Sequence, residues 1–365
     1  EKVYAAYSTF SNQLGKFGYQ AGLRVESSSY EGRLPDKNQV FNVDFPVSLF
    51  PSIFLNQKLK NEQELQLNYT RKINRPNFFQ LYPYTDYSDS LNISRGNPNL
   101  NPEFTNSLEL TYQKSFKNKD NFIASVYYKN TTDLIARYQL KENNAASGKE
   151  QLVNTYINAN SGYVTGLELI SKNKMAKWWD MTSNFNLFTS RISINDPTQP
   201  KQDQVASWFF KLNNTFKLPK NFTLQLSGDY TSKTVLAPGG SGGNSGGGGG
   251  GGRGMMGGGM MWGSATSSQG YTRANYGIDG GLRYEFMKNK VASISLNVND
   301  IFRTRRQYTY SESAYFQQDF FRRRDPQVLR LNFSWRFGKF DASLFKRKNQ
   351  KSQDNSGDMM GGMGQ

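Results

Sequence analysis

Apolar and polar residues alternate one by one over long stretches of this chain, and this period of two constrains the fold more than any other feature. Phe222, Leu224 and Leu226 fall on one side of an extended segment, while the polar residues between them fall on the other side. The same alternation returns at residues 65–70 and 329–337. Because successive side chains of a strand point to opposite faces, the pattern predicts β-strands with one apolar and one polar face. No stretch shows a convincing helical stripe.

The alternation predicts about 13 strands. Several of these segments reach or exceed the roughly 9 to 11 residues that a tilted strand needs to cross a bilayer. The predicted strands are residues 2–11, 16–27, 41–58, 62–74, 103–115, 121–139, 153–172, 178–194, 203–217, 221–236, 268–287, 290–306 and 326–337.

The connections between these segments alternate between short and long. The long ones are residues 28–40, 75–102, 140–152, 195–202, 237–267 and 307–325. A soluble β-sandwich has no reason to keep every second loop short, whereas an outer-membrane barrel has tight periplasmic turns and longer extracellular loops. We therefore predict an all-β fold, a transmembrane antiparallel up-and-down β-barrel in the bacterial outer membrane, with lipid on its apolar face and water on its polar face.

The composition excludes several classes of function. The 365 residues contain no cysteine and no histidine, so disulfides, thiolate nucleophiles, cysteine zinc sites and histidine general bases are all excluded. No nucleophile motif or metal spacing is visible, and we expect neither an enzyme nor a cofactor. No run approaches the roughly 20 apolar residues of a membrane-spanning helix.

Aromatic residues near the predicted strand ends are candidates for the girdles that barrels place at the membrane interfaces. The alternative is that they are ordinary core or surface aromatics. The candidates are Tyr7, Tyr19, Tyr112, Tyr127, Tyr128, Trp178, Trp179 and Trp208.

The short turns, if periplasmic, orient the chain. The last predicted strand then runs inward, so residues 1–337 are expected to be barrel and residues 338–365 a low-complexity periplasmic tail. An odd strand count differs from the even numbers of bacterial single-chain barrels. We therefore expect that at least one strand, and a large N-terminal portion of the barrel, lies outside these residues.

Several segments resemble the outer-membrane β-barrel family of Bacteroidota that is related to TonB-dependent receptors. The most specific is RGNPNLNPE at residues 95–103, which opens the strand at 103–115. The start of the chain, residues 65–84, NVNDIFRTRRQ and the closing LRLNFSWRFGKF are also similar. The resemblance implies that the chain is the C-terminal part of a larger barrel, such as one of 22 strands. It also implies a plug region upstream and possible coupling to TonB through that plug.

Residues 237–267 form a Gly- and Met-rich segment that we expect to be a flexible extracellular loop within the barrel. The segment lacks the GK[ST] ending of a phosphate-binding loop. Its methionines and Trp262 have an alternative use as an adaptable contact for a partner or as soft metal ligands.

Basic residues gather around the last outer loop, where we expect them to face the phosphate groups of lipopolysaccharide in the outer leaflet. Finding these side chains in the lumen would reject that hypothesis. Nucleic-acid binding is the competing use of a chain with formal charge +16, but no nucleic-acid-binding fold is visible. The residues are Arg303, Arg305, Arg306, Arg322, Arg323 and Arg324.

Two further sets of residues are candidates for contacts. Aromatics in the long connection 75–102 are suited to stacking on a sugar, or to packing on a peptide or protein partner, although loop aromatics more often pack against their neighbours. They are Phe78, Phe79, Tyr82, Tyr84 and Tyr87. The final strand resembles the signal that the barrel assembly machinery reads, through Leu331, Phe333, Trp335 and Phe337.

The function predicted from the sequence is binding and passage of a nutrient or other solute across the outer membrane. Two alternatives stay open. The first is a structural accessory barrel in an outer-membrane assembly or secretion complex, in contact with other outer-membrane proteins. The second is a passive pore.

Overall fold

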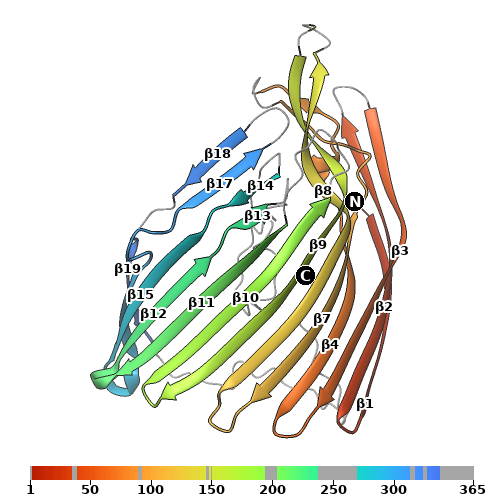
Figure 1. The fold of residues 1–365 in the computed structure, drawn as a ribbon. Helices are drawn as coiled ribbons and strands as arrows, with labels where there is room; N and C mark the ends of the chain where they lie inside the picture. Colours follow the sequence, from red (N-terminus) through yellow and green to blue (C-terminus); the bar gives the residue numbers. More distant parts are fainter. Residues whose placement is uncertain are drawn as a thin grey trace.

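The computed structural model describes residues 2–34, 39–88, 93–144, 148, 150–193, 204–236, 269–312, 317–323 and 327–337. Thirteen strands follow one another through the main sheet (Figure 1): β1 (Lys2–Leu14), β2 (Phe17–Leu34), β3 (Gln39–Lys58), β4 (Gln63–Asn74), β7 (Glu103–Ser115), β8 (Asn121–Asn143), β9 (Glu150–Ala176), β10 (Trp179–Ser193), β11 (Val205–Leu218), β12 (Phe222–Thr231), β15 (Asn275–Phe286), β16 (Ala292–Val298) and β19 (Leu329–Trp335).

The remaining elements are short. They are the helix α1 (Phe78–Leu81), the 3-10 turns η2 (Pro219–Asn221) and η3 (Lys288–Lys290), and the strands β5 (Thr85–Asp86), β6 (Ile93–Arg95), β13 (Thr234–Leu236), β14 (Gln269–Thr272), β17 (Gln307–Glu312) and β18 (Gln317–Arg322). No helix in the described residues is long and apolar enough to cross a membrane.

Each strand along the main sheet pairs antiparallel with the one before it, in the order β1-β2-β3-β4-β7-β8-β9-β10-β11-β12-β15-β16-β19. Figure 1 shows this sheet as a curved wall, with the short turns at its lower end and the longer connections at its upper end. The predicted up-and-down antiparallel arrangement and its 13 segments are confirmed.

The strand register keeps apolar and polar residues on separate faces across the sheet. One row of directly opposed residues is apolar on four neighbouring strands: Leu224, Leu282, Leu296 and Leu331. The adjacent row is mostly polar: Gln225, Gly281, Asn297 and Arg330. Leu282, Leu296 and Leu331 of the apolar row are exposed and Leu224 is half-buried, as is expected of a barrel face that contacts lipid.

Aromatic rings gather at the short-turn end of the wall. Trp178, Trp179 and Phe216 lie together, with ring centroids 5.8 to 6.2 Å apart, and Phe222 stacks on Tyr284 at 4.5 Å. This arrangement is typical of an interfacial girdle.

Tyr127 differs from the girdle prediction. Its ring is buried and its hydroxyl donates a hydrogen bond to Asn186 Oδ1 at 3.0 Å. The position therefore lies in the polar wall rather than at a membrane interface.

The structure also divides two of the predicted strands and shortens a third. Residues 221–236 become β12 and β13, residues 268–287 become β14 and β15, and the segment expected at 290–306 ends as a strand at Val298. The upper pieces join two strands from the predicted 307–325 loop in a separate sheet of order β13-β14-β17-β18. Alternation alone did not reveal these interruptions, because the polarity pattern continues across them.

Candidate functional site

The connection between β4 and β7 is folded rather than a free loop. We call its described residues, 75–88 and 93–102, the cap segment. Asn77 begins α1 with a capping box: its Oδ1 accepts from Gln80 N at 3.0 Å, and Gln80 Oε1 accepts from Asn77 N at 2.8 Å. Farther along, β5 pairs with β6, and β6 pairs in parallel with β9.

A small apolar core lies under the cap segment. Leu81 and Leu100 have 0% and 1% of their surface exposed and pack together with Ile135 of β8. Side chains from β2, β3 and β9 surround these three: Tyr30, Phe41, Val43 and Tyr156. The cap segment therefore links the β2–β3 hairpin to the β8–β9 hairpin, which are the two long hairpins that flank it in Figure 1.

Polar contacts hold the cap segment along its length. Arg75 forms an ion pair with the buried Glu26 of β2, and its Nε donates to Ser28 Oγ at 2.8 Å. Arg95 pairs with Glu142 of β8 at 2.9 Å. Each of these bonds crosses to a neighbouring hairpin, so the cap segment is held in one position relative to the wall.

The NPNLNPE run explains why the cap segment ends as it does. Gly96 donates to Tyr82 O at 3.0 Å, and a Cβ at this glycine would clash with the backbone of Tyr82. Asn97 Nδ2 then donates to Tyr156 O at 2.9 Å. Asn101 N donates to Asn158 Oδ1 at 2.8 Å. The motif is thus a set of backbone contacts to β9 and α1, in addition to the turn expected from its prolines and asparagines.

Glu103, the last residue of this motif, fixes the entry into β7. Its Oε1 accepts a hydrogen bond from Ile135 N at 2.6 Å, and its Oε2 accepts one from Asn74 Nδ2 at 2.6 Å. One carboxylate therefore joins the start of β7 to β8 and to the end of β4.

The cap segment presents an aromatic cluster of Phe41, Phe78, Phe79, Tyr82 and Tyr84. Phe78 stacks on Tyr82 at 5.1 Å, and Tyr82 lies 5.9 Å from Tyr84. Phe79 meets Phe78 edge-on at 5.8 Å and is 79% exposed. The structure thus brings together four of the five aromatics predicted from the sequence, while Tyr87 is exposed outside this cluster.

Phe41 is the member of the cluster that the sequence did not reveal. Its ring lies 6.4 Å from Phe78 and 6.3 Å from Tyr82. Gly32 is its register partner on β2, and a Cβ there would clash with the Phe41 ring. A glycine opposite a phenylalanine is the only sequence signal, and it is a weak one without the register.

The exposed rings provide flat apolar surfaces suited to stacking. Asp86 of β5 follows Tyr84 by two residues in the chain, and its Oδ1 accepts a hydrogen bond from Ser88 N at 2.9 Å. The backbone hydrogen bond from Ser88 holds the pKa of Asp86 below its usual value. The cap segment therefore carries both a stacking surface, in the cluster, and an ionised carboxylate, at Asp86.

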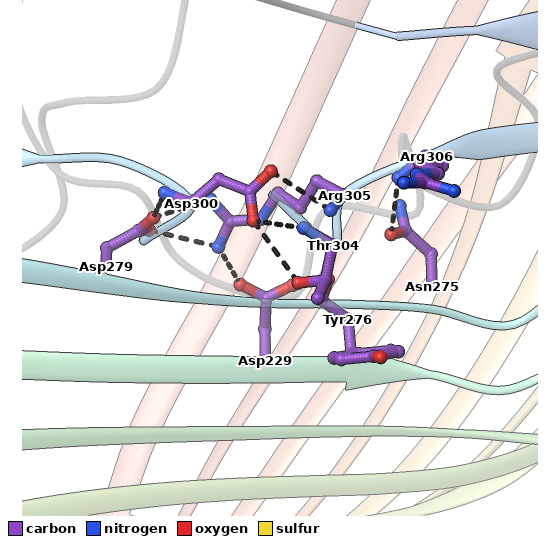
Figure 2. A network of polar contacts seen from close by, with 8 residues as sticks. All are labelled: Asp229, Asn275, Tyr276, Asp279, Asp300, Thr304, Arg305 and Arg306. Atoms are coloured by element: carbon purple, nitrogen blue, oxygen red, sulfur yellow. Dashed lines mark hydrogen bonds and ion pairs between the residues drawn. The ribbon is translucent and has the colours of Figure 1, made fainter. Parts of the chain in front are cut away.

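A second polar network is centred on Arg305, in the turn after β16, and includes residues of β12 and β15 (Figure 2). Its guanidinium donates to Asp279 at 2.7 and 3.0 Å and also pairs with Asp229. Asp300 accepts from Thr304 N at 2.8 Å and from Arg305 N at 3.1 Å. The hydrogen bonds to Asp279 and Asp229 raise the pKa of Arg305, which therefore stays charged.

Arg305 consequently differs from the expectation that it faces lipid. A Cβ on Gly277 would clash with its side chain, and Gly277 is the register partner of Asp229 on the polar face. The acidic residues on that face attract the guanidinium inward, so Arg305 leaves the predicted lipid-contact set.

The other described arginines of that set are all exposed: Arg303, Arg306, Arg322 and Arg323. Register places Arg322 opposite Gln307, which follows Arg306. Arg324 lies outside the described residues, as do the Gly- and Met-rich segment 237–267 and the tail 338–365.

The final strand exposes the apolar side that the sequence predicted. Leu331, Phe333, Trp335 and Phe337 are all exposed, and β19 pairs with β16 through one edge. Within the described part of the chain, no group of three or more acidic residues is placed to hold a metal ion.

Comparison with solved structures shows the same fold in outer-membrane transporters. The FrpB iron transporter from Neisseria meningitidis is 13% identical with a TM-score of 0.57, and the match covers 91% of this chain and 45% of that one. The ferric-catecholate import receptor Fiu from E. coli K12 is 15% identical with a TM-score of 0.57, covering 92% and 44%. The copper transporter OprC is 12% identical with a TM-score of 0.60, covering 91% and 47%.

The chain thus spans less than half the length of each of these transporters. No curated protein matches its sequence. The sequence does match the outer membrane protein beta-barrel family over residues 1–246 and 255–335, which is most of its length. This chain therefore belongs to the outer membrane protein beta-barrel family.

Proposed function

We propose that this barrel captures a solute at its outer end and passes it across the outer membrane. The observation that carries the proposal is the aromatic cluster, whose exposed rings stand on a cap segment fixed to two long hairpins. Rings held by a folded scaffold lose little conformational freedom on binding, which favours recognition of a flat or apolar ligand. The fold shared with iron and copper transporters supports the same class of function.

The proposal includes an orientation and a larger assembly. The cap segment faces the outside, and the short turns and the C-terminus face the periplasm. Further strands join the free edges of β1 and β19 to close a larger barrel, such as one of 22 strands. The solved transporters, each more than twice as long as their matched part, support this. Energy coupling through TonB belongs to a plug region of such a longer protein.

The polar face of the wall provides the path below the aromatic cluster. Polar side chains that are not buried lie along this face, among them Gln225, Asn297 and Arg330. Such side chains allow a hydrated solute to pass, and the proposal contains no catalytic step.

The test uses the full-length protein extracted from outer membranes and incubated with a concentrate of spent growth medium. Native mass spectrometry then identifies the solutes that stay bound. Phe79→Ala is expected to weaken retention roughly tenfold, because it removes the most exposed stacking surface. Phe116→Ala is the matched control, since it removes an exposed ring at the short-turn end.

Other outcomes favour the alternatives. No retained solute together with stable co-purification of other outer-membrane proteins would indicate an accessory subunit. Ion conductance in planar bilayers that Phe79→Ala leaves unchanged would indicate a passive pore.

We further propose that β19 is read by the barrel assembly machinery. The support is its exposed apolar side and its unpaired outer edge within the described sheet. Phe333→Asn is expected to lower the amount of folded protein in the outer membrane, measured by heat-modifiable mobility in gels. An unchanged amount of folded protein would contradict this role.

A further inference from the structure

The turn after β16 carries the apolar face of the wall up to its outer rim. Ile301 N donates to Ile278 O at 2.8 Å. A Cβ built on Gly280 would lie 3.1 Å from Ile301 Cδ1 and 3.6 Å from Leu226 Cδ2. Since Leu226 lies on the apolar face, the side chain of Ile301 lies on that face too. Phe302, the next residue, is exposed.

Arg303 is held directly beside this apolar rim. Its Nε donates to Gln327 Oε1 at 2.6 Å, while Gln327 Nε2 donates to Ile301 O at 2.7 Å. The glutamine therefore ties the arginine to the residue that lies on the apolar face. The rest of the guanidinium remains exposed.

Three further exposed arginines lie in the same connection and at the end of β18, which follows it. Arg306 is followed by Gln307, which lies opposite Arg322, and Arg323 comes next in the chain. We call Arg303, Arg306, Arg322 and Arg323 the outer arginine patch. Asp319 of β18 pairs instead with Arg273, at 3.6 Å.

The outer arginine patch differs from Arg305 in the charges that surround it. Two aspartates pair with Arg305 on the polar face, whereas the four patch arginines are exposed, and Arg303 is bonded to Gln327, two residues before the exposed Leu329. Positive charge beside an apolar stripe complements a molecule with anionic groups at one end and hydrocarbon at the other. Arginine adds bidentate geometry, which suits phosphate.

We propose that the outer arginine patch binds the phosphate groups of an outer-leaflet glycolipid, whose acyl chains lie on the apolar face of β16 and β19. The inference rests on the orientation in the proposed function, in which the rim with the long connections faces the outer leaflet. A bound lipid of this kind would hold the rim of the wall in the membrane at a fixed depth.

The test uses full-length protein purified in detergent and titrated with bisphosphorylated lipid A, with binding followed by native mass spectrometry. Changing all four patch arginines to glutamine is expected to weaken binding roughly tenfold, through loss of charge-assisted contacts. Changing them to lysine keeps the charge but not the bidentate geometry, so we expect a loss of about threefold. Lys60, Lys220, Lys288 and Lys290, all changed to glutamine, give a control with the same net charge at the short turns.

Lipid A without phosphates is expected to bind the unchanged protein weakly, and inorganic phosphate is expected to compete poorly because it lacks acyl chains. Equal binding of both lipids, or an equal loss in the lysine-turn control, would overturn the proposal. If the glutamine variant does not fold, the lysine variant decides, and full binding by it would contradict the bidentate contacts. Solute retention by the aromatic cluster, measured on the same samples, should stay unchanged, so the two proposals fail separately.

Discussion

Two long connections at the end of this wall opposite the short turns are attached to it in different ways. The cap segment between β4 and β7 buries Leu81 and Leu100, whereas residues 299–306 after β16 are held by Arg305 and three aspartates. The first leaves aromatic rings exposed, and the second leaves arginines exposed. The side chains that a connection leaves exposed therefore depend on which of its other side chains attach it to the wall.

The largest effect is expected from breaking the apolar core of the cap segment. Leu100→Ala should lower the stability of the cap segment by about 2 to 5 kcal/mol, because it removes a fully buried side chain and leaves a cavity. Hydrogen exchange of the backbone amides at residues 93–102 measures this local opening.

Leu110→Ala is the matched control, since Leu110 lies exposed on the apolar face of β7. Equal exchange in the two variants would show that the cap segment is not held by its apolar core. The burial of Leu81 and Leu100 would then not explain how this connection is attached to the wall.

The second effect concerns the ionic attachment of residues 299–306. Arg305→Met removes the ion-pair partner that Asp229 and Asp279 share and leaves only Lys211, the register partner of Asp229, as a nearby cation, so we expect a loss of about 1 to 3 kcal/mol. This expected loss of stability is smaller than for a fully buried ion pair, because Arg305 is 29% exposed. Chemical denaturation of the full-length protein, followed by tryptophan fluorescence, measures the change.

Adding Asp229→Asn and Asp279→Asn to Arg305→Met should recover most of the loss, since the two carboxylates that lost their partner are then neutral. If the triple variant is as unstable as Arg305→Met alone, the ion pairs are not what holds this connection.

A smaller effect should follow from the contact between Gly32 and Phe41. Gly32→Ala places a methyl group against the Phe41 ring, which must move away from Phe78 and Tyr82. We expect a changed near-ultraviolet circular dichroism spectrum and a several-fold loss of solute retention. Gly148→Ala serves as a control because a Cβ there meets open space, although its positive φ adds local strain. An unaltered spectrum and retention in Gly32→Ala would separate Phe41 from the aromatic cluster.

The smallest effect is electrostatic and lies in the upper sheet. The Tyr310 hydroxyl donates to Glu312 Oε2 at 2.9 Å, and this hydrogen bond raises the pKa of Tyr310. The contribution to stability is present below the usual tyrosine pKa and is lost as pH rises through the raised value. Glu312→Gln should move the pKa of Tyr310 downward in a nuclear magnetic resonance titration, and Asp319→Asn should move it less. A pKa that stays the same in Glu312→Gln would contradict the hydrogen bond.

The wall was predictable from the sequence because alternation is a local property. Leu224 and Leu226 reveal their face without any knowledge of their partners on β15. The side assigned to Arg305 was not predictable, because it depends on Asp229, which lies 76 residues earlier. The strand predicted at residues 290–306 ends at Val298 for a related reason. Asp300 and Ile301 continue the polarity pattern, but their backbone turns away from the sheet.

The candidate site was predictable in part. The aromatic content of residues 78–84 is visible in the sequence, and four of those rings do meet. The residues that hold these rings in place were not visible in the sequence. Phe41 and Ile135 belong to β3 and β8, and Leu100 follows the pairing of β5 with β6. Local patterns identify the surface, but only register identifies what holds it.

We expect the cap segment to face the outside of the cell and the short turns to face the periplasm. Because these residues contain no native cysteine, Ser88→Cys and Asn118→Cys can be labelled individually in intact cells with a membrane-impermeant maleimide. We expect labelling at position 88 and none at position 118 until the outer membrane is opened, with the unchanged protein as background. Labelling at position 118 but not at 88 in intact cells would contradict the account.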